Sequence, residues 1–356
     1  MKTYLITGGA GFIGSTLGEE ILKKGDRVIL LDNFNDYYDY ILKIRNVLDT
    51  VGKIEVSKNI NQYFICDENE TKSETKLENI NRLKKIVDSD SVKIEFVDIR
   101  DLAEMNRVFS ENKIDTVVHL AAMAGVRPSI EDPLLYEEVN VRGTNILFEV
   151  MRKNGVNKVL AASSSSVYGN SKTVPFKESD IVDFAISPYA ATKKANEVLA
   201  HTYHHLYNLN VVMLRFFTVF GPKQRPDLAI SKFTKLISNG EKIPFFGDGT
   251  TSRDYTYVGD IVKGILLLSE YLDKNDNVYE ICNIGGSDPV SLKEMVETIE
   301  VVLGKKANLE KLPMQPGDVE RTYADLTKIK KLVGYAPENS FKQGVEKFVK
   351  WYFEKI

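Results

Sequence analysis

The stretch TGGAGFIGS, residues 7–15, constrains the fold of this chain more than any other. It follows the apolar run TYLIT and leads into the helical pattern TLGEEILKKG, so it forms a sharp turn between a strand and a helix. Gly8, Gly11 and Gly14 keep this turn free of side chains, and glycine tolerates positive φ angles. Such a turn lets backbone amides at a helix N-terminus approach a phosphate group. We therefore predict a phosphate-binding turn after the first strand of a sheet.

Strand and helix patterns alternate through the first two thirds of the chain. The strand-like runs are apolar, are bounded by polar residues or glycine, and are separated by segments with helical spacing. These runs are YLIT, RVILLD, KIEFVD, TVVHLAA, KVLAASS, VVMLRFF and YEICNIG. The alternation predicts an α/β fold with a doubly wound (Rossmann) parallel sheet.

The regular alternation of strand and helix patterns ends at Gly221, and turns and short segments such as FFGDGTTSRDYTYV follow. We predict a larger domain of residues 1–220 and 261–284, and a smaller α/β domain of residues 221–260 and 285–356. Residues 58–92 interrupt the larger domain with a polar stretch, and a structureless loop of that length is unusual in a compact domain. Because LENINRLKKIV has helical spacing, we expect a partly folded surface excursion, with a cover over a partner or substrate as the alternative.

Composition narrows the possible roles. Hydrophobic residues make up 43% and charged residues 27% of the chain, and the formal net charge is -3, so a globular fold is expected. No basic block indicates a nucleic-acid surface. The two cysteines form no disulfide framework, and neither a secretory leader nor an apolar run of about 18 residues is evident. We therefore expect a cytoplasmic protein with no nucleic-acid partner and no membrane span.

An acidic residue follows the glycine turn at the distance typical of dinucleotide-binding folds. Asp32 ends the run RVILLD, and its carboxylate can accept both ribose hydroxyls of NAD while repelling the 2′-phosphate of NADP. We therefore predict NAD as the cofactor, with FVDIRD beside the adenine and the small side chains of HLAA along the dinucleotide. The predicted cofactor contacts before and after the catalytic helix are Gly8, Gly11, Phe12, Ile13, Gly14, Asp32, Asn33, Asp98, Ile99, Leu120, Ala121, Ala122 and Phe216.

The segment SPYAATKKANEVLA, residues 187–200, carries candidate chemistry. Tyr189 and Lys193 lie four positions apart on a predicted helix, so they share one face and can both contact NAD. A tyrosine hydroxyl ionises at about pH 10 in water. A nearby ammonium and the positive nicotinamide ring favour phenolate, so we expect the pKa of Tyr189 to fall toward that of a general base. AASSSSVYG, residues 161–169, ends another strand in the same crevice and offers serine hydroxyls to a substrate hydroxyl.

Together these motifs resemble those of the extended short-chain dehydrogenases, specifically the nucleotide-sugar 4-epimerases. The resemblance runs from TGGAGFIGS through SSSSVYG, PYAATKK, RFFTVFGP, RDYTYVGDI and PGDV, and only residues 58–92 depart from it clearly. The chain is most similar to the UDP-glucuronate 4-epimerase branch, on LDNFNDYYD, HLAAMAGVRPSIEDP, RFFTVFGPKQRPDLAI and PMQPGDV. The resemblance implies that Tyr189 is the base, that Lys193 lowers its pKa and that Ser164 contacts the sugar 4-hydroxyl. It also implies a homodimer, and a hydride that passes from C4 to tightly held NAD and returns to the opposite face.

A uronic acid would be selected by a few further residues. Thr218 stands where the glucose-type 4-epimerases usually carry asparagine. Arg225 supplies a guanidinium that can pair with a carboxylate at two points, although it could also be a surface arginine beside a proline. In similar enzymes the hydroxyls that correspond to Ser165 and Ser166 meet the same carboxylate. Holding the carboxylate as an anion resists loss of CO2 from a 4-keto uronic acid.

The nucleotide is expected against the smaller domain. Arg253, in SRDYTYV, resembles the family's phosphate-binding arginine, and Asp318, in PGDV, resembles its ribose contact. A surface salt bridge is the alternative for each. No metal is predicted, although His201 and His205 lie one helical turn apart, because no step of the proposed chemistry needs one.

Two other functions stay open. The substrate could be a different sugar nucleotide, such as UDP-glucose or an N-acetylated or 6-carboxylated relative, or the protein could bind NAD without catalysis. The serine stretch lacks the glutamate typical of the family's decarboxylases and the Asp-Glu pair of its sugar 4,6-dehydratases.

Overall fold

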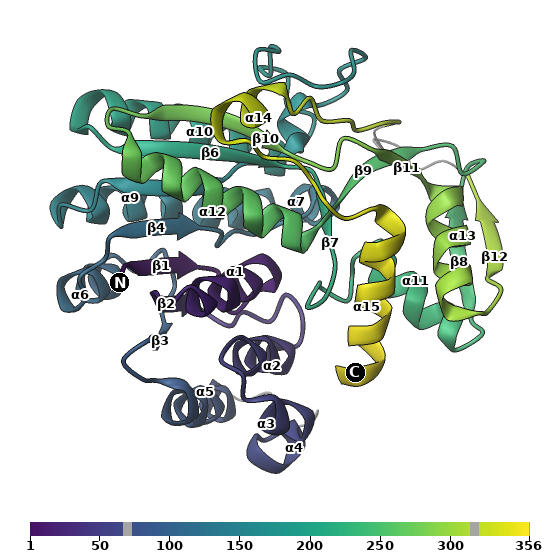
Figure 1. The fold of residues 1–356 in the computed structure, drawn as a ribbon, viewed down its shortest axis with the longest axis horizontal. Helices are drawn as coiled ribbons and strands as arrows, with labels where there is room; N and C mark the ends of the chain where they lie inside the picture. Colours follow the sequence, from purple (N-terminus) through teal and green to yellow (C-terminus); the bar gives the residue numbers. More distant parts are fainter. Residues whose placement is uncertain (67–72, 314–319, 356) are drawn as a thin grey trace.

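The computed structural model describes residues 1–66, 73–313 and 320–355. Within them, a seven-stranded parallel sheet has the strand order β10-β6-β5-β4-β1-β2-β3 (Figure 1). Its strands are β1 (Thr3–Thr7), β2 (Arg27–Asp32), β3 (Val92–Phe96), β4 (Thr116–His119), β5 (Lys158–Ala162), β6 (Asn210–Phe216) and β10 (Tyr279–Ile284). The predicted doubly wound sheet is confirmed, and each of the seven apolar runs contributes one strand.

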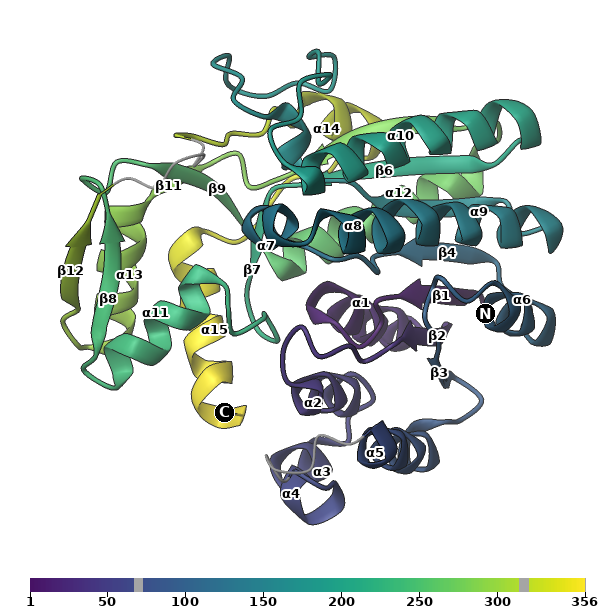
Figure 2. The same ribbon diagram turned by 180° about the vertical axis from the view of Figure 1, so that it is seen from behind.

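Helices cover both faces of this sheet because alternate strand residues point to opposite sides. Leu5 and Ile29 belong to one core, whereas their neighbours Ile6 and Leu30 belong to the other. The face seen in Figure 1 carries α12 (Val258–Lys274), and it shares its core with α1 (Phe12–Lys23) and α2 (Tyr40–Thr50). The face seen in Figure 2 carries α9 (Gly143–Lys153) and α10 (Pro188–Tyr207), whose core also includes α6 (Leu102–Glu111).

The strand order reverses between β1 and β4. Connections that leave these two strands depart in opposite directions, so the carboxyl ends of the strands border a crevice at this point. The segment after β4 approaches the crevice through α7 (Val126–Glu131), α8 (Pro133–Tyr136) and the π-helical turn η1 (Glu137–Arg142). The segment after β5 enters it through the 3-10 turn η2 (Ser165–Tyr168).

A third core lies beside the large sheet (Figure 1). It is built from α11 (Ala229–Ser238), α13 (Leu292–Leu303) and α15 (Phe341–Lys355), with a three-stranded sheet of β7 (Thr218–Phe220), β9 (Ser252–Tyr257) and β11 (Pro289–Ser291) and a parallel pair of β8 (Lys242–Phe246) and β12 (Asn308–Leu312). Ile329 of α14 (Thr327–Val333) and Tyr335 join the core of the large sheet instead. The domain boundaries predicted from the sequence remain an interpretation.

The polar stretch between β2 and β3 is partly helical, as its spacing predicted. It contains α4 (Ile60–Tyr63) and α5 (Ser73–Val87), which follow α3 (Ile54–Lys58). α5 is amphipathic, and its residues Ile80, Leu83 and Val87 are buried in the core that contains α1 and α2. One face of α5 therefore packs into the core of the large sheet, so this part of the stretch is not wholly surrounded by solvent.

Candidate active site

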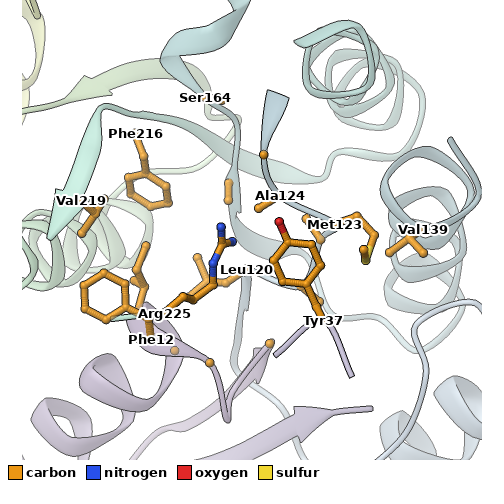
Figure 3. A pocket seen from close by; sticks show the side chains of 18 of the residues that line it. Phe12, Tyr37, Leu120, Met123, Ala124, Val139, Ser164, Phe216, Val219 and Arg225 are labelled. Atoms are coloured by element: carbon orange, nitrogen blue, oxygen red, sulfur yellow. The ribbon is translucent and has the colours of Figure 1, made fainter. Parts of the chain in front are cut away.

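A cavity of about 450 Å³ opens at the carboxyl ends of the parallel strands, where the strand order reverses (Figure 3). All the residues predicted to contact the cofactor line it, and so do Ser164, Ser165, Ser166, Thr218 and Arg225. Residues from the first turn and from the middle of the chain therefore share one site. Their roles in binding and catalysis remain predictions.

The glycine positions of the turn leave no space for a Cβ atom. Gly8 has a φ of +69°, and a Cβ at this position would lie 2.9 Å from the backbone nitrogen of Ala121. A Cβ on Gly14 would lie only 2.3 Å from the carbonyl oxygen of Gly8. Helix α1 begins after Gly11, and no side chain among the described residues caps it. Uncapped amides at a helix start suit an anion, so this turn fits the diphosphate of a dinucleotide.

Asp32 lies at the next strand end, with 7% of its surface exposed. Its carboxylate accepts hydrogen bonds from the backbone amides of Ala10, at 3.2 Å, and Phe34, at 2.8 Å. Lys43 Nζ lies 3.6 Å from Asp32 Oδ1 and donates to the side chain of Asn35 at 2.8 Å. These bonds fix the carboxylate at the cavity wall, where it can accept from ribose hydroxyls.

Asp98 follows β3 and extends the same polar end of the cavity. Asn33 Nδ2 donates to its Oδ2 at 3.0 Å, and the Arg100 guanidinium donates to both of its carboxylate oxygens. Burial raises the pKa of Asp98, but the hydrogen bonds from Arg100 and Asn33 outweigh burial and lower it to about 2. The carboxylate is therefore ionised, and it orients Asn33 beside Asp32.

Helix α10 presents Tyr189 and Lys193 to the cavity. Ser187 caps the helix by accepting a hydrogen bond from the backbone amide of Ala190 at 3.1 Å. Lys193 Nζ donates to the carbonyl oxygen of Ala162 at 2.8 Å and lies 5.9 Å from the ring centroid of Tyr189. Burial lowers the pKa of Lys193 to about 8. The ammonium is thus fixed between the end of β5 and the tyrosine.

The expected fall in the pKa of Tyr189 does not arise from the protein's own groups. Burial raises this pKa, because a buried phenolate loses its hydration, and a hydrogen bond with Ser164 and the charge of Arg225 offset only part of the increase. Lys193 makes its hydrogen bond to the carbonyl oxygen of Ala162. A lowered pKa needs an additional positive charge, which the nicotinamide ring of NAD carries.

Arg225 lines the same cavity and is largely buried, with 19% of its side chain exposed. Its Nε and Nη2 donate to the carboxylate of Asp227 at 3.0 and 2.8 Å. Its guanidinium lies 5.0 Å from the ring centroid of Tyr37, and Figure 3 shows the two side chains next to each other. The surface alternative for Arg225 is therefore wrong.

The predicted nucleotide contacts are not both brought to this cavity. Arg253 lies on β9, donates its Nη1 to the carbonyl oxygen of Ser252 at 2.9 Å, and does not belong to the described lining of the cavity. Asp318 lies outside the described residues.

Sequence reasoning missed several lining residues. Tyr37 and Tyr38 follow the acidic strand end within LDNFNDYYD, so this stretch contained a local signal in its paired aromatic residues. Lys43 enters the cavity from α2, and no linear motif marks it. The other lining residues that were not predicted are Leu31, Asn35, Val97, Met123, Ala124, Gly125, Val139, Ala162, Ser163, Phe217, Val219 and Leu228.

The histidines of α10 do not gather other metal-binding side chains in the described part of the chain. The rings of His201 and His205 are stacked, with centroids 6.5 Å apart. Residues 1–66, 73–313 and 320–355 contain no group of three or more His, Cys, Asp or Glu side chains that could hold a metal ion. In the same ranges, no helix is both long enough and apolar enough to cross a membrane.

Comparison with known proteins places the chain in a family. The family model described as GDP-mannose 4,6 dehydratase matches residues 53–348. The chain belongs to the GDP-mannose 4,6 dehydratase family. A UDP-glucuronate 4-epimerase from Thermodesulfobacterium geofontis is 40% identical over 357 residues, with 100% of this chain and 98% of the relative covered.

Solved structures of family relatives share the fold over nearly the whole chain. UDP-glucuronic acid 4-epimerase from Bacillus cereus, in complex with UDP-glucuronic acid and NAD, is 30% identical with a TM-score of 0.82, and 99% of each chain is covered. UDP-glucose 4-epimerase from Thermotoga maritima, in complex with UDP-glucose, is 28% identical with a TM-score of 0.79, again with 99% of each chain covered. Members of similar fold are thus named for different sugars, so the sugar must be argued from the site.

Proposed function

We propose that this protein is an NAD-dependent 4-epimerase that interconverts UDP-glucuronate and UDP-galacturonate. The observation that carries this proposal is one cavity that joins the glycine turn and Asp32 to Tyr189 and Lys193, with Arg225 in the same wall. The first pair suits a dinucleotide, the second suits proton transfer at a sugar hydroxyl, and the guanidinium suits a carboxylate. The activity for which the relatives are named supports the same reading.

The reacting hydroxyl is assigned to the end of the cavity formed by α10 and β5. NAD, held by the glycine turn and Asp32, would supply a hydride acceptor and donor for C4 of the sugar. Tyr189 takes the proton of the 4-hydroxyl and gives it back, while the Ser164 hydroxyl, which hydrogen-bonds Tyr189, holds the same oxygen. Lys193, fixed by Ala162, keeps a positive charge beside the tyrosine ring and favours phenolate.

The carboxylate of the sugar is assigned to Arg225, with Ser165, Ser166 and Thr218 as hydroxyl donors. A 4-keto uronic acid is a β-keto acid: it loses CO2 when the C5–C6 bond breaks and the electron pair of that bond moves toward the C4 ketone to form an enolate. Charged and hydroxyl donors stabilise the carboxylate anion and oppose that movement. The site therefore permits epimerisation of a uronic acid without forming a pentose.

The remaining roles belong to the same proposal. Arg253 and Asp318 are assigned to the UDP moiety on the resemblance of their motifs. A homodimer is proposed because Val198 and Leu206 expose more than half of their surface on α10. A cytoplasmic location is proposed because Cys66 and Cys282 are both unpaired thiols.

A parallel assay of the purified protein with UDP-glucuronate and UDP-glucose tests the function, with products resolved by proton NMR. We expect UDP-galacturonate from the first substrate and little product from the second. Tyr189→Phe is the matched control, because it removes only the hydroxyl: turnover should fall at least about 1000-fold while NAD remains bound.

Other results would overturn specific parts of the proposal. UDP-galactose as the preferred product would retain the 4-epimerase reaction but contradict the carboxylate assignment of Arg225, in favour of the UDP-glucose alternative. A pentose product would show that the carboxylate is not protected. Full activity in Tyr189→Phe would exclude the tyrosine as the base.

A further inference from the structure

Three consecutive residues at the end of β5, Ala162 to Ser164, contact three residues on one face of α10. The helix residues are Tyr189, Lys193 and Glu197, spaced by four, so each lies one turn from the next. The contacts pair Lys193 Nζ with the Ala162 carbonyl oxygen at 2.8 Å, Ser163 Oγ with Glu197 Oε1 at 2.7 Å, and Ser164 with Tyr189 through a side-chain hydrogen bond. Two of these contacts involve the proposed reacting groups. The third, between Ser163 and Glu197, has no role in the proposed chemistry.

Glu197 is also the centre of a buried polar cluster. Arg215 of β6 donates its Nε to Glu197 Oε1 at 2.8 Å and its Nη2 to Oε2 at 2.9 Å, and both residues are 1% exposed. Arg215 Nη1 donates to the hydroxyl of Tyr168 at 3.0 Å, which in turn donates to Asn283 Oδ1 on β10 at 2.6 Å. The Glu197 carboxylate is therefore held by Arg215 of β6 and by Ser163 at the end of β5. Movement of α10 along the sheet would break the two-point charge pair with Arg215.

The backbone at Ser163 is fixed from the other side. Its amide donates to the carbonyl oxygen of Leu214 on β6 at 2.8 Å, so the residue is tied to the neighbouring strand through its backbone and to α10 through its hydroxyl. Ser163 is 2% exposed, so solvent offers little substitute for the hydrogen bond between its hydroxyl and Glu197. Its position sets where the Ala162 carbonyl and the Ser164 hydroxyl lie relative to Lys193 and Tyr189.

We propose that Ser163 and Glu197 are positioning residues for the epimerisation, which hold Ser164 and Lys193 at the distances that proton transfer by Tyr189 needs. The inference rests on the proposed function and deepens its account of the site. Small displacements of a reacting group slow a reaction strongly, even when the displaced group is not removed.

The pH profile offers a readout that a purely structural role would not change. The groups that face Tyr189 are Ser164 from β5, Lys193 on its own helix, Arg225 from the loop before α11, and the ring of Tyr136, 6.2 Å away, from α8. Among them, the hydrogen bond with Ser164 lowers the pKa of Tyr189. A misplaced Ser164 weakens this bond, so the pKa of Tyr189 rises and the acid limb of the kcat profile moves to higher pH.

Ser163→Ala tests the proposal, because it deletes one hydroxyl and leaves the charge pair of Glu197 with Arg215 intact. We expect kcat with UDP-glucuronate to fall about tenfold, with KM changed less than about twofold and the acid limb shifted upward. Ser269→Ala is the matched control: Ser269 is also a buried serine with one side-chain partner, Tyr4, and it lies on α12 away from the cavity. Its kcat and pH profile should equal those of the unaltered protein, and the two variants should have similar melting temperatures.

A second variant, Glu197→Gln, keeps the size of the side chain and removes its charge. It should lower kcat more than Ser163→Ala does; if it does not fold, Ser163→Ala decides the question alone. An unaltered kcat and pH profile in folded Ser163→Ala would overturn the inference. Failure of the unaltered protein to epimerise would instead overturn the proposed function, so the two failures are distinct.

Discussion

The guanidinium of Arg225 holds one carboxylate and leaves donors for another. Its Nε and Nη2 donate to Asp227, and the ring of Tyr37 lies against its plane. Five N–H donors radiate from a guanidinium, so the Nη1 edge can serve a second carboxylate. Asp227 thus orients the plane of Arg225, and we assign the Nη1 edge to the uronic acid.

Replacement of Arg225 should change the choice of sugar more than the reaction itself. We expect Arg225→Ala to lower kcat/KM for UDP-glucuronate by about 10- to 100-fold, because a charge-assisted two-point contact is lost. Any residual turnover of UDP-glucose should change less than about threefold. Arg225→Lys keeps the charge without the fork and should recover only part of the loss. An equal decrease with both substrates, measured by the same NMR assay, would contradict the assignment.

At the scale of the elements, β4 brings a buried histidine beneath the cavity wall. His119 Nδ1 lies 2.7 Å from Thr7 Oγ1, and its Nε2 lies 2.9 Å from Thr144 Oγ1. Thr144 donates to the carbonyl oxygen of Asn140, so it accepts the hydrogen from Nε2. Thr7 Oγ1 also accepts from the backbone amides of the two residues after His119, which fixes the wall that is predicted to line the dinucleotide.

This histidine should make the stability of the fold depend on pH. Burial, together with the charge of Lys193, lowers the pKa of His119 to about 3. Between about pH 6.5 and 3 the unfolded chain binds a proton here that the folded protein does not, so stability decreases as the pH falls through this range.

The comparison of His119→Gln with the unaltered protein at pH 6 and pH 5 isolates this contribution. Denaturant titration should show that the unaltered protein loses up to about 1.4 kcal/mol per pH unit more unfolding free energy than the variant does. Parallel pH dependences would mean that His119 titrates alike in both states.

Across the whole molecule, the last helix joins the third core to the large sheet's side. Lys355 Nζ lies 2.9 Å from Asp49 Oδ1 of α2, and both side chains are less than a tenth exposed. Arg45 of the same helix donates to the carbonyl oxygen of Lys355. Because α2 also carries Lys43, which lies beside Asp32, this contact connects α15 to the helix that borders the cofactor end of the cavity.

Removal of Lys355 should show how much the ion pair with Asp49 contributes to the unfolding free energy. We expect Lys355→Met to lower the unfolding free energy by about 3 kcal/mol, because it leaves Asp49 buried without its ion-pair partner. Lys306→Met is the control: Lys306 pairs with Glu300, but its side chain is 88% exposed, so the change should lower the unfolding free energy far less than Lys355→Met does. Equal midpoints for the two variants in thermal and denaturant unfolding would show that the buried pair does not hold α15.

The sequence by itself determined the parallel sheet, the glycine turn, Asp32 and the shared face of Tyr189 and Lys193. Each of these depends on spacing within a short segment, since apolar periodicity sets strands and helices and a four-residue interval sets a helical face. The serine stretch was also readable, because it follows a strand whose end lies in the crevice.

Only the tertiary structure decided what these groups contact. Three contacts join segments that are separate in the sequence: Lys193 with the Ala162 carbonyl, Lys43 with Asp32, and Glu197 with Arg215. Arg225 pairs locally with Asp227, but its guanidinium also packs on Tyr37, which is distant in the sequence. The pKa of Tyr189 also depends on segments that are distant in the sequence. Spacing places a cation near a phenol, but the balance between charge and desolvation is set by every element that packs around them.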